Sequence, residues 1–280
     1  QEAERQAAVS ALAKLTAGKV YVGVKAGTSL SLKDCEVVSF EGPHPAGNVG
    51  VQINHIKPIN KGEQVWTVSA YDLIVIGRAL AGKVDFSRII TIAGSEIVAP
   101  AYAKVLPGSS IASVVAGKVK GADYTQRFIA GNVLTGQNAG KEGTVGFYDN
   151  TVTVIPDGGD TDEMFGWITP GLNRYSTSPT GLAGLFGLFK SKSWTLDARL
   201  KGGSRALIVS GDWEKVFPMD IFPEELYKAT LTFNIDRMEA LGIYEVAPED
   251  FALCEFVDAS KTPVQQVIAD GLVKLRKEME

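Results

Sequence analysis

The sequence is poor in the side chains on which metal and thiol chemistry depend. Among its 280 residues are two cysteines, Cys35 and Cys254, and two histidines, His44 and His55. Two cysteines far apart in the chain make neither a disulfide framework nor, by themselves, a thiolate cage for a metal. Two histidines form a zinc site only together with several carboxylates. We therefore expect no metal centre in this chain.

Long hydrophobic runs and an excess of positive charge are also missing. No stretch approaches the roughly 18 consecutive apolar residues of a membrane-spanning helix. The formal net charge of −4 argues against a nucleic-acid partner, since such proteins are usually basic. Hydrophobic residues at 45% and charged residues at 21% are ordinary for a globular protein and exclude wholesale disorder. The composition indicates a soluble, intracellular protein of more than one domain.

The common signatures of self-sufficient active sites are absent as well. The stretch 131–142 holds three glycines and a Gly-Lys pair, but Glu142 stands where a phosphate-binding loop needs Ser or Thr. Residues 160–163 include three acidic side chains, yet they lack Asp or Asn at the third ligand position of a calcium loop. No nucleophile elbow accompanies either histidine. We expect no catalytic residue and no cofactor held by this chain alone.

Residues 1–86 have the pattern of an α/β domain. A helix is predicted over 2–15, and it leads directly into a strand at 20–24. A second strand is expected at 37–40, followed by a loop at 42–48 that is dense in Gly and Pro. Residues 70–80 read as a buried helix. Because the sequence starts at Gln1 and opens with a helix that feeds a strand, we expect a piece of a longer chain.

Residues 87–157 change to a β-rich pattern. Strands are predicted at 88–94, 101–105 and 126–130 and within 145–155, with a turn at Pro107-Gly108. Ser109 is expected to cap a short helix over 111–115. This order of strands around one short helix is typical of a small β-grasp module.

Residues 158–205 form an irregular part. Between positions 174 and 205 there are six basic residues and one acidic residue, next to the apolar run 181–189, and we call residues 174–205 the basic–apolar segment. It is either a loop folded over the core or a docking surface for a membrane partner or an anionic lipid surface. The candidate docking residues are Arg174, Leu185, Phe186, Phe189, Lys190 and Lys192.

Residues 206–280 have a helical pattern with a second feature inside it. Helices are predicted from Pro223 and from Pro263, the latter with a buried stripe of Val267, Ile268, Leu272 and Leu275. Ferredoxin cluster sites have the spacing Cys-x-x-Cys-x-x-Cys-x-x-x-Cys-Pro, and this part of the sequence can be aligned with that spacing in two places. The first alignment ends at Pro218, and the second, which is less exact, lies before Pro263. The eight cysteine positions are occupied here by Leu207, Ser210, Trp213 and Phe217, and by Pro248, Phe251, Cys254 and Asp258. Such a set cannot hold a cluster, because the soft ligands are missing.

These parts and several local runs carry a resemblance to a known family. The run 40–50 (FEGPHPAGNVG), together with Val65-Trp66, Tyr71-Asp72, Arg205-Ala206 and residues 218–221, resembles the A subunit of the sodium-translocating NADH:quinone reductases. The order of domains is also similar to the C subunit of Rnf complexes and to the flavin-bearing subunit of respiratory complex I. Nearly the whole chain shares in this resemblance.

The resemblance implies a fold and a division of the chain. Residues 1–86 would be the C-terminal part of a Rossmann-like domain, and 87–157 a β-grasp (soluble-ligand-binding) module. Residues 158–205 would dock, and 206–280 would be a helical domain resembling a ferredoxin domain without clusters. The fold class is then α/β and α+β in several domains.

It also implies a function. The chain would be a peripheral subunit on the cytoplasmic face of the bacterial inner membrane, in a complex that oxidises NADH, reduces quinone and exports sodium. The flavins and the iron–sulfur centre would belong to other subunits, and the main partner would be the quinone-reducing membrane subunit.

Three roles stay open for the chain itself: a scaffold that docks other subunits, a contributor to quinone binding, or a stand-alone binder of a soluble ligand. The two histidines are the side chains that could hydrogen-bond a quinone oxygen near neutral pH. His44 lies between two prolines, where it equally fits a rigid loop. His55 is expected on a strand next to Ile53 and Ile56, mainly as a structural residue.

Overall fold

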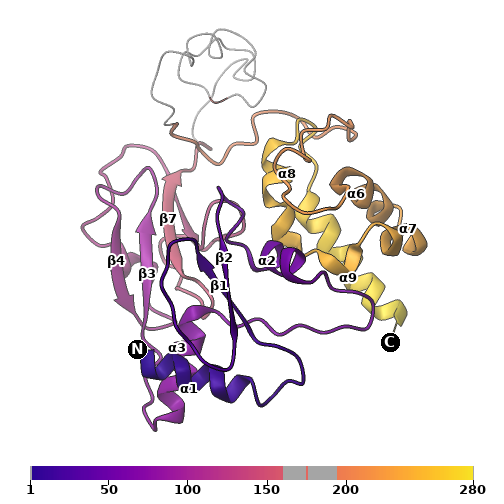
Figure 1. The fold of residues 1–280 in the computed structure, drawn as a ribbon. Coiled ribbons are helices and arrows are strands. Elements are labelled where there is room, and N and C mark those ends of the chain that lie inside the picture. The colour runs from indigo at the N-terminus through magenta and orange to yellow at the C-terminus, as the bar shows by residue number, and fades with distance from the viewer. Residues whose placement is uncertain (1, 160–174, 176–193, 280) are drawn as a thin grey trace. The chain divides into compact units, whose positions relative to one another are not determined.

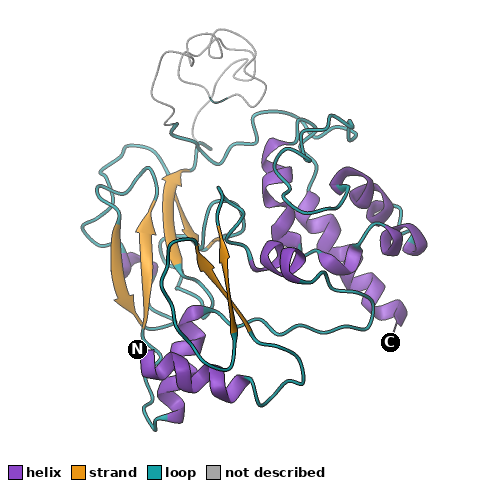
Figure 2. Ribbon diagram, in the orientation of Figure 1, coloured by secondary structure: helices purple, strands orange, loops and turns teal. Residues whose placement is uncertain are grey.

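The computed structural model describes residues 2–159, 175 and 194–279, and it is drawn in Figure 1. The chain forms two compact units. Unit 1 consists of Gln1–Phe86 together with Leu207–Glu280, and unit 2 of Ser87–Ala206. Helices and strands occur together in the chain (Figure 2) and in each of the two units, so the expected mixed α/β character is confirmed. The finer division at residues 86, 157 and 205 stays a prediction.

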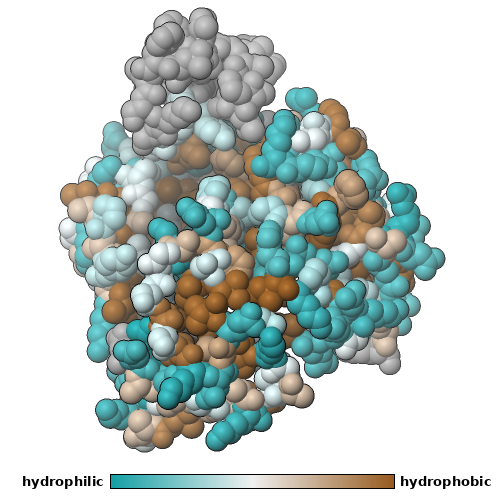
Figure 3. All heavy atoms as spheres, viewed as in Figure 1, coloured by the Kyte–Doolittle hydropathy of each residue, from teal (hydrophilic) through white to brown (hydrophobic). Residues whose placement is uncertain are grey.

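The N-terminal part of unit 1 contains three helices and a small sheet. They are α1 (Glu2–Leu12), β1 (Tyr21–Lys25), β2 (Glu36–Phe40), α2 (Val49–Ile56) and α3 (Ala70–Leu80). β1 and β2 pair in parallel, with Gly23 opposite Val38, and no residue of either strand is buried. In the view of Figure 3, apolar side chains gather over the region of β1, β2 and α2.

α1 and α3 pack against each other very closely. A methyl group added at Gly77 of α3 would lie 2.0 Å from the backbone oxygen of Glu4 in α1, so only glycine fits this crossing. Arg78 then bridges the Glu4 carboxylate at 3.6 Å and the Asp85 carboxylate at 3.1 Å. The sequence predicts a buried α3, but Gly77 is its one buried residue. The reason is that α1 covers one side of α3 and leaves the remaining apolar side chains half exposed.

The C-terminal part of unit 1 is helical. It contains α6 (Pro223–Leu231), α7 (Ile235–Ala240), α8 (Ala252–Val257) and α9 (Val264–Met279), with the 3-10 turns η1 (Ile243–Glu245) and η2 (Pro248–Phe251). Pro223 begins α6 as expected. In α9 the buried residues are Val264, Ile268, Gly271 and Leu275. The predicted stripe is therefore correct at Ile268 and Leu275, whereas Val267 and Leu272 are only partly buried against the core. These helices surround one apolar core that also takes in Val51 of α2.

Unit 2 is built on a five-stranded sheet in the order β4-β3-β7-β5-β6. The strands are β3 (Arg88–Ala93), β4 (Ala101–Val105), β5 (Gln126–Ala130), β6 (Gln137–Asn138) and β7 (Thr151–Pro156). β3 and β7 are parallel, and the other pairs are antiparallel. The short helix α4 (Ile111–Val114) supplies Ile111 and Val114 to a core with the buried side chains of β3, β5 and β7.

Several local predictions are wrong in detail. α4 follows Ser110, whose side chain makes no capping hydrogen bond, and Ser109 does not cap it. Residues 145–150 form a loop, so the last strand begins only at Thr151, and the two-residue strand β6 has no counterpart among the predicted strands. Residues 49–56 form a helix, whereas the sequence predicts His55 on a strand. Their alternating Val and Ile residues fit a strand equally well over such a short run, and packing against the helical core decides the outcome.

In the described ranges no helix has both the length and the apolar character needed to span a bilayer.

Candidate functional site

Two features of unit 1 meet where its α/β part touches its helical part. They are the loop after β2 and the core that contains most of the residues at the two sets of ferredoxin-like cysteine positions, which we call the two frames. Loop 41–48 leaves the carboxyl end of β2 and enters α2. In open α/β sheets, ligands bind beyond the carboxyl ends of parallel strands. This loop is therefore where sheet topology alone would place a ligand.

His44 lies in this loop. Its side chain is exposed, the following Pro45 is buried, and the peptide bond between them is cis. Gly42 adopts a φ of 148°, a conformation that favours glycine. The loop is held from α2 by Gln52, whose Nε2 lies 3.5 Å from the carbonyl oxygen of Ala46. His44 is thus presented to solvent on a supported loop.

His55 is placed differently. It is exposed in the last turn of α2, and its Nδ1 lies 2.9 Å from the carbonyl oxygen of Val51. α2 has eight residues and is about 12 Å long, with His44 before its start and His55 near its end. The structure therefore does not bring the two histidines together into one site.

α2 is fixed to the helical part by polar contacts as well as by Val51. Nδ2 of Asn54 donates to the Glu245 carboxylate at 2.7 Å. Burial raises the pKa of Glu245, and the Asn54 amide opposes that rise. Farther along the chain, Lys61 pairs with Glu239 at 2.7 Å.

Gly50, in the first turn of α2, lies against the buried carboxylate of Asp250. A methyl group on Gly50 would come within 2.4 Å of Oδ2 of Asp250. That oxygen accepts the backbone N–H of Ala247 at 2.8 Å, while Oδ1 has no hydrogen-bond partner among the described residues. Burial raises the pKa of Asp250 to about 6, the negative charge of Glu249 adds to the rise, and the Ala247 N–H opposes it. The carboxyl group is therefore poorly suited to carrying a charge here.

Both frames contribute side chains to one apolar core. Trp213, Phe217, Phe251 and Cys254 are all buried in it. The rings of Phe217 and Phe251, one from each frame, lie 4.9 Å apart, and Trp213 packs edge-on against Tyr227 at 5.4 Å. Leu207 is half-buried against the same core, whereas Ser210 is exposed and Pro248 is half-buried at the start of η2. Aromatic rings therefore occupy the interior between the two frames.

Buried carboxylates organise the backbone around this core. Oε1 of Glu224 accepts the N–H groups of Ser210 at 3.3 Å and Gly211 at 3.1 Å. Asp258 accepts the N–H of Ser260 at 3.2 Å and both the N–H and the hydroxyl of Thr262 at 2.7 Å. Sequence reasoning misses Glu224, because acidic residues are common in the first turn of any helix.

Cys254 does not offer a reactive thiol. It is fully buried, and its burial strongly raises the pKa of the thiol, as do the negative charges of Glu214, Glu224 and Asp258. A thiolate is the form that binds metals or attacks as a nucleophile. Among the described residues there is no cluster of three or more His, Cys, Asp or Glu side chains arranged to hold a metal ion.

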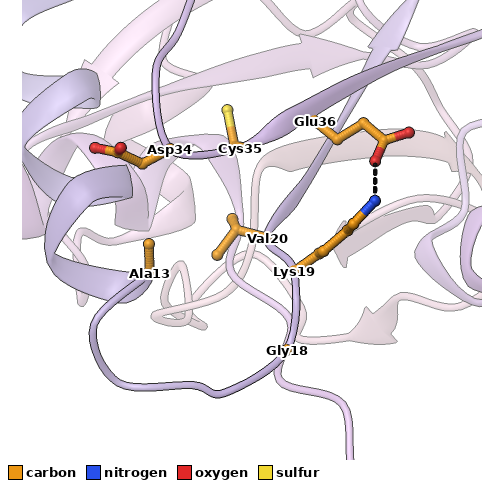
Figure 4. Close-up of a pocket in the computed structure, with 7 residues that line it drawn as sticks. All are labelled: Ala13, Gly18, Lys19, Val20, Asp34, Cys35 and Glu36. Atoms are coloured by element: carbon orange, nitrogen blue, oxygen red, sulfur yellow. Dashed lines mark hydrogen bonds and ion pairs between the residues drawn. The ribbon is translucent and has the colours of Figure 1, made fainter.

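A shallow pocket of about 300 Å³ lies elsewhere in unit 1, and Figure 4 shows its lining. It sits before the amino ends of β1 and β2, next to Cys35 and an exposed pair of Lys19 and Glu36 at 3.2 Å. Burial and the charge of Asp34 raise the pKa of the Cys35 thiol. None of the predicted site residues lines it, and its end of the parallel strands is the one that ligands usually avoid.

The predicted docking residues Arg174, Leu185, Phe186, Phe189, Lys190 and Lys192 lie outside the described residues. Within the basic–apolar segment, the described part includes Arg199 and Lys201, which both pair with Asp197. The positive charges of Arg199 and Lys201 are therefore paired with a carboxylate of the same chain.

Comparisons with known proteins give a consistent result. Residues 1–84 match the family described as NqrA second alpha/beta domain, and residues 89–141 match the NQRA C-terminal domain. The chain is 36% identical to the A subunit of the Na(+)-translocating NADH-quinone reductase of Serratia proteamaculans, over 99% of this chain and 62% of that protein. It is 35% identical to the corresponding protein of Pasteurella multocida, over 98% of this chain and 61% of the relative. It is 34% identical to the corresponding protein of Neisseria meningitidis serogroup A, over 95% of this chain and 60% of the relative.

Proposed function

We propose, from the premise that this chain belongs to the NqrA family, that it serves as one subunit of a complex that oxidises NADH, reduces quinone and moves sodium ions. The observation that carries the proposal is the similarity, over 99% of the chain, to a relative named as the A subunit of such a reductase. The chain spans about three fifths of the length of these relatives. The activity belongs to the complex, and the role proposed for this chain is to dock and support other subunits.

Docking without electron transfer fits the residues present. An iron–sulfur cluster of the ferredoxin kind needs four thiolates, and the sequence has two cysteines, one of them fully buried in the helical core. Aromatic side chains from both frames pack where soft ligands would be required. We infer that NADH, the flavins and the iron–sulfur centre are bound by other subunits.

The finer fold assignments belong to this proposal. The parallel pairing of β1 and β2 next to helices supports a Rossmann-like origin for residues 1–86. The mixed five-stranded sheet with one short helix supports a β-grasp module in 87–157. The meeting of both frames in one core supports a degenerate ferredoxin-like domain in 206–280.

For the place of action and the partner, we propose the cytoplasmic face of the membrane and the quinone-reducing membrane subunit. The excess of basic residues in the basic–apolar segment, six against one acidic residue, favours contact with an anionic surface or partner protein. The role as a stand-alone binder of a soluble ligand is not favoured, because the relatives named above are subunits of a complex.

A contribution to quinone binding is the second candidate, and His44 is the residue for it. It is exposed, near neutral pH an imidazole can hydrogen-bond a quinone oxygen, and its loop follows the carboxyl end of a parallel strand. His44→Ala should weaken quinone binding to the complex without lowering the melting temperature. His55→Ala is the matched control, because His55 lies at the far end of α2. Equal quinone affinity in wild type and His44→Ala would contradict this role.

The docking role is tested by charge reversal. The double substitution Lys190→Glu and Lys192→Glu should weaken recovery of the chain with its membrane partner, while Lys215→Glu should leave it unchanged. Lys215 is an exposed lysine of unit 1 that pairs with nearby Asp212 at 2.7 Å. Unchanged assembly in the double variant would contradict docking through this segment.

A further inference from the structure

The coil between α2 and α3 presents an exposed tryptophan on a segment that is held at both ends. Before it, Lys57 pairs with Glu63 at 2.7 Å, and Lys61 pairs with Glu239 of α7 at 2.7 Å. After it, Ser69 caps α3 by accepting the N–H of Asp72 at 3.1 Å. Residues 64–68 lie between these anchors, and we call them the Trp66 segment.

The side chains of the Trp66 segment are unusually open to solvent. Trp66 is 90% exposed, Val65 is 51% exposed and Val68 is 43% exposed. A tryptophan buries on the order of 200 Å² when it is covered, and tryptophan is enriched among the residues that dominate protein interfaces. This position therefore offers a strong anchor that unit 1 itself does not use.

The backbone N–H and carbonyl groups of the segment are also available for hydrogen bonds. Within residues 2–159, 175 and 194–279, no N–H or carbonyl group of residues 64–68 makes a hydrogen bond. Val, Trp and Thr are residues that favour β-strands. A β-prone stretch with free backbone groups is suited to pairing with the edge strand of another protein.

The same features distinguish a protein partner from a lipid surface. Free backbone N–H and carbonyl groups are costly to bury in lipid, where nothing satisfies them, whereas a partner strand satisfies them directly. The segment itself carries no charge, and the flanking Lys57 and Lys61 already pair with carboxylates. An anionic membrane would require free basic residues at this place. An uncharged edge strand of another protein therefore fits this segment better than a lipid surface does.

We propose that the Trp66 segment docks onto another subunit of the complex, where it pairs with an edge strand and inserts Trp66 into an apolar pocket beside that strand. This inference rests on the proposed function, since it names the kind of surface through which the chain joins its complex. It is separate from the basic–apolar segment, which lies in unit 2.

The direct test is site-specific photo-cross-linking in the assembled complex. A photoreactive phenylalanine analogue replaces Trp66, and in a matched variant it replaces Val84, which is 82% exposed in the same unit. We expect a cross-link to another subunit from position 66 and none from position 84. Cross-links only to a second copy of this chain, to its own polypeptide or to lipid, or none at all, would overturn the proposal.

A substitution gives an independent measurement. Trp66→Ser should weaken association with the other subunits about tenfold or more, as expected for a central interface residue. Val84→Ser should leave association unchanged, and neither change should lower the melting temperature. Unchanged affinity of Trp66→Ser would overturn the inference. If the wild-type chain itself fails to assemble with the other subunits, the proposed function fails instead.

Discussion

At the scale of single residues, buried carboxylates hold the helical part of unit 1 together, and they do so in two ways. Glu224 and Asp258 each accept several hydrogen bonds from backbone or hydroxyl groups and so fix the loops around the core. Asp250 accepts one from Ala247 and faces the bare Cα of Gly50. Both oxygens of Asp258 accept hydrogen bonds, whereas Oε2 of Glu224 and Oδ1 of Asp250 have no partner among the described residues.

The burial of Asp250 predicts that the stability of the protein depends on pH. Its pKa rises from 3.8 to about 6 on folding, so the folded state holds the proton more tightly and stability falls as pH rises through this range. The shift corresponds to about 3 kcal/mol at most. Asp250→Asn should therefore flatten the free energy of unfolding between pH 4 and pH 7 and raise it at pH 7, as measured by urea denaturation.

The matched control for this prediction is Asp258→Asn. Asp258 is just as buried, but its oxygens accept three hydrogen bonds, so losing the carboxylate should lower stability at pH 7. A pH profile of Asp250→Asn with the slope of the wild type would show that Asp250 does not titrate in this way.

A side chain at position 50 should destabilise the protein, because the Asp250 carboxylate lies directly against the Cα atom of Gly50. Gly50→Ala places a methyl group 2.4 Å from an Asp250 oxygen, and we expect a loss of about 1–3 kcal/mol in the free energy of unfolding. Gly47→Ala, three residues earlier, meets nothing within 4 Å and should be nearly neutral. Thermal unfolding of both variants makes the comparison, and equal stabilities would refute the close contact.

At the scale of elements, the crossing of α1 and α3 depends on one glycine. Gly77→Ala would place its methyl group against the backbone oxygen of Glu4, which cannot move aside as a side chain could. We expect a loss of about 2–4 kcal/mol or the release of α1. Hydrogen exchange of residues 2–12 should then become much faster.

The comparison for Gly77 is Leu80→Ala on the same helix. Leu80 is 58% exposed, so its truncation should leave exchange in α1 almost unchanged. If α1 remains protected in Gly77→Ala, the helices do not cross as closely as the structure places them.

Elements with a clear pattern could be predicted from the sequence, whereas short apolar runs could not. The strands at 88–93 and 101–105 and the helices after Pro223 and Pro263 follow from β-branched runs, turn residues and helical spacing. Residues 49–56 alternate Val and Ile like a strand but form α2, because Val51 and Asn54 are drawn to the helical core. That core lies some 200 positions away in the chain, which no local pattern reveals.

In the candidate site too, local sequence patterns could be predicted, whereas contacts between residues far apart in the sequence could not. The spacing of the two frames could be read from the sequence, but their meeting in a single core through Phe217 and Phe251 could not. The contact between Gly50 and Asp250 and the hydrogen bonds of Glu224 are equally long-range. They depend on the packing of α2 against helices that are encoded at the other end of the chain.

At the scale of the whole molecule, unit 1 is assembled from both ends of the chain, and unit 2 is the segment between them. Matches to NqrA domains fall in each unit, at residues 1–84 and 89–141. The exposed Trp66 and His44 lie in unit 1 and the basic–apolar segment belongs to unit 2, so the segments proposed for contact with other proteins come from both units.

The most direct test of this account is native mass spectrometry of material purified through a tag on this chain from cells that make the remaining subunits. We predict a single assembly in which one copy of the chain accompanies the other subunits of the NADH:quinone reductase. Recovery of the chain alone or only with copies of itself, while the other subunits assemble without it, would contradict the proposed function.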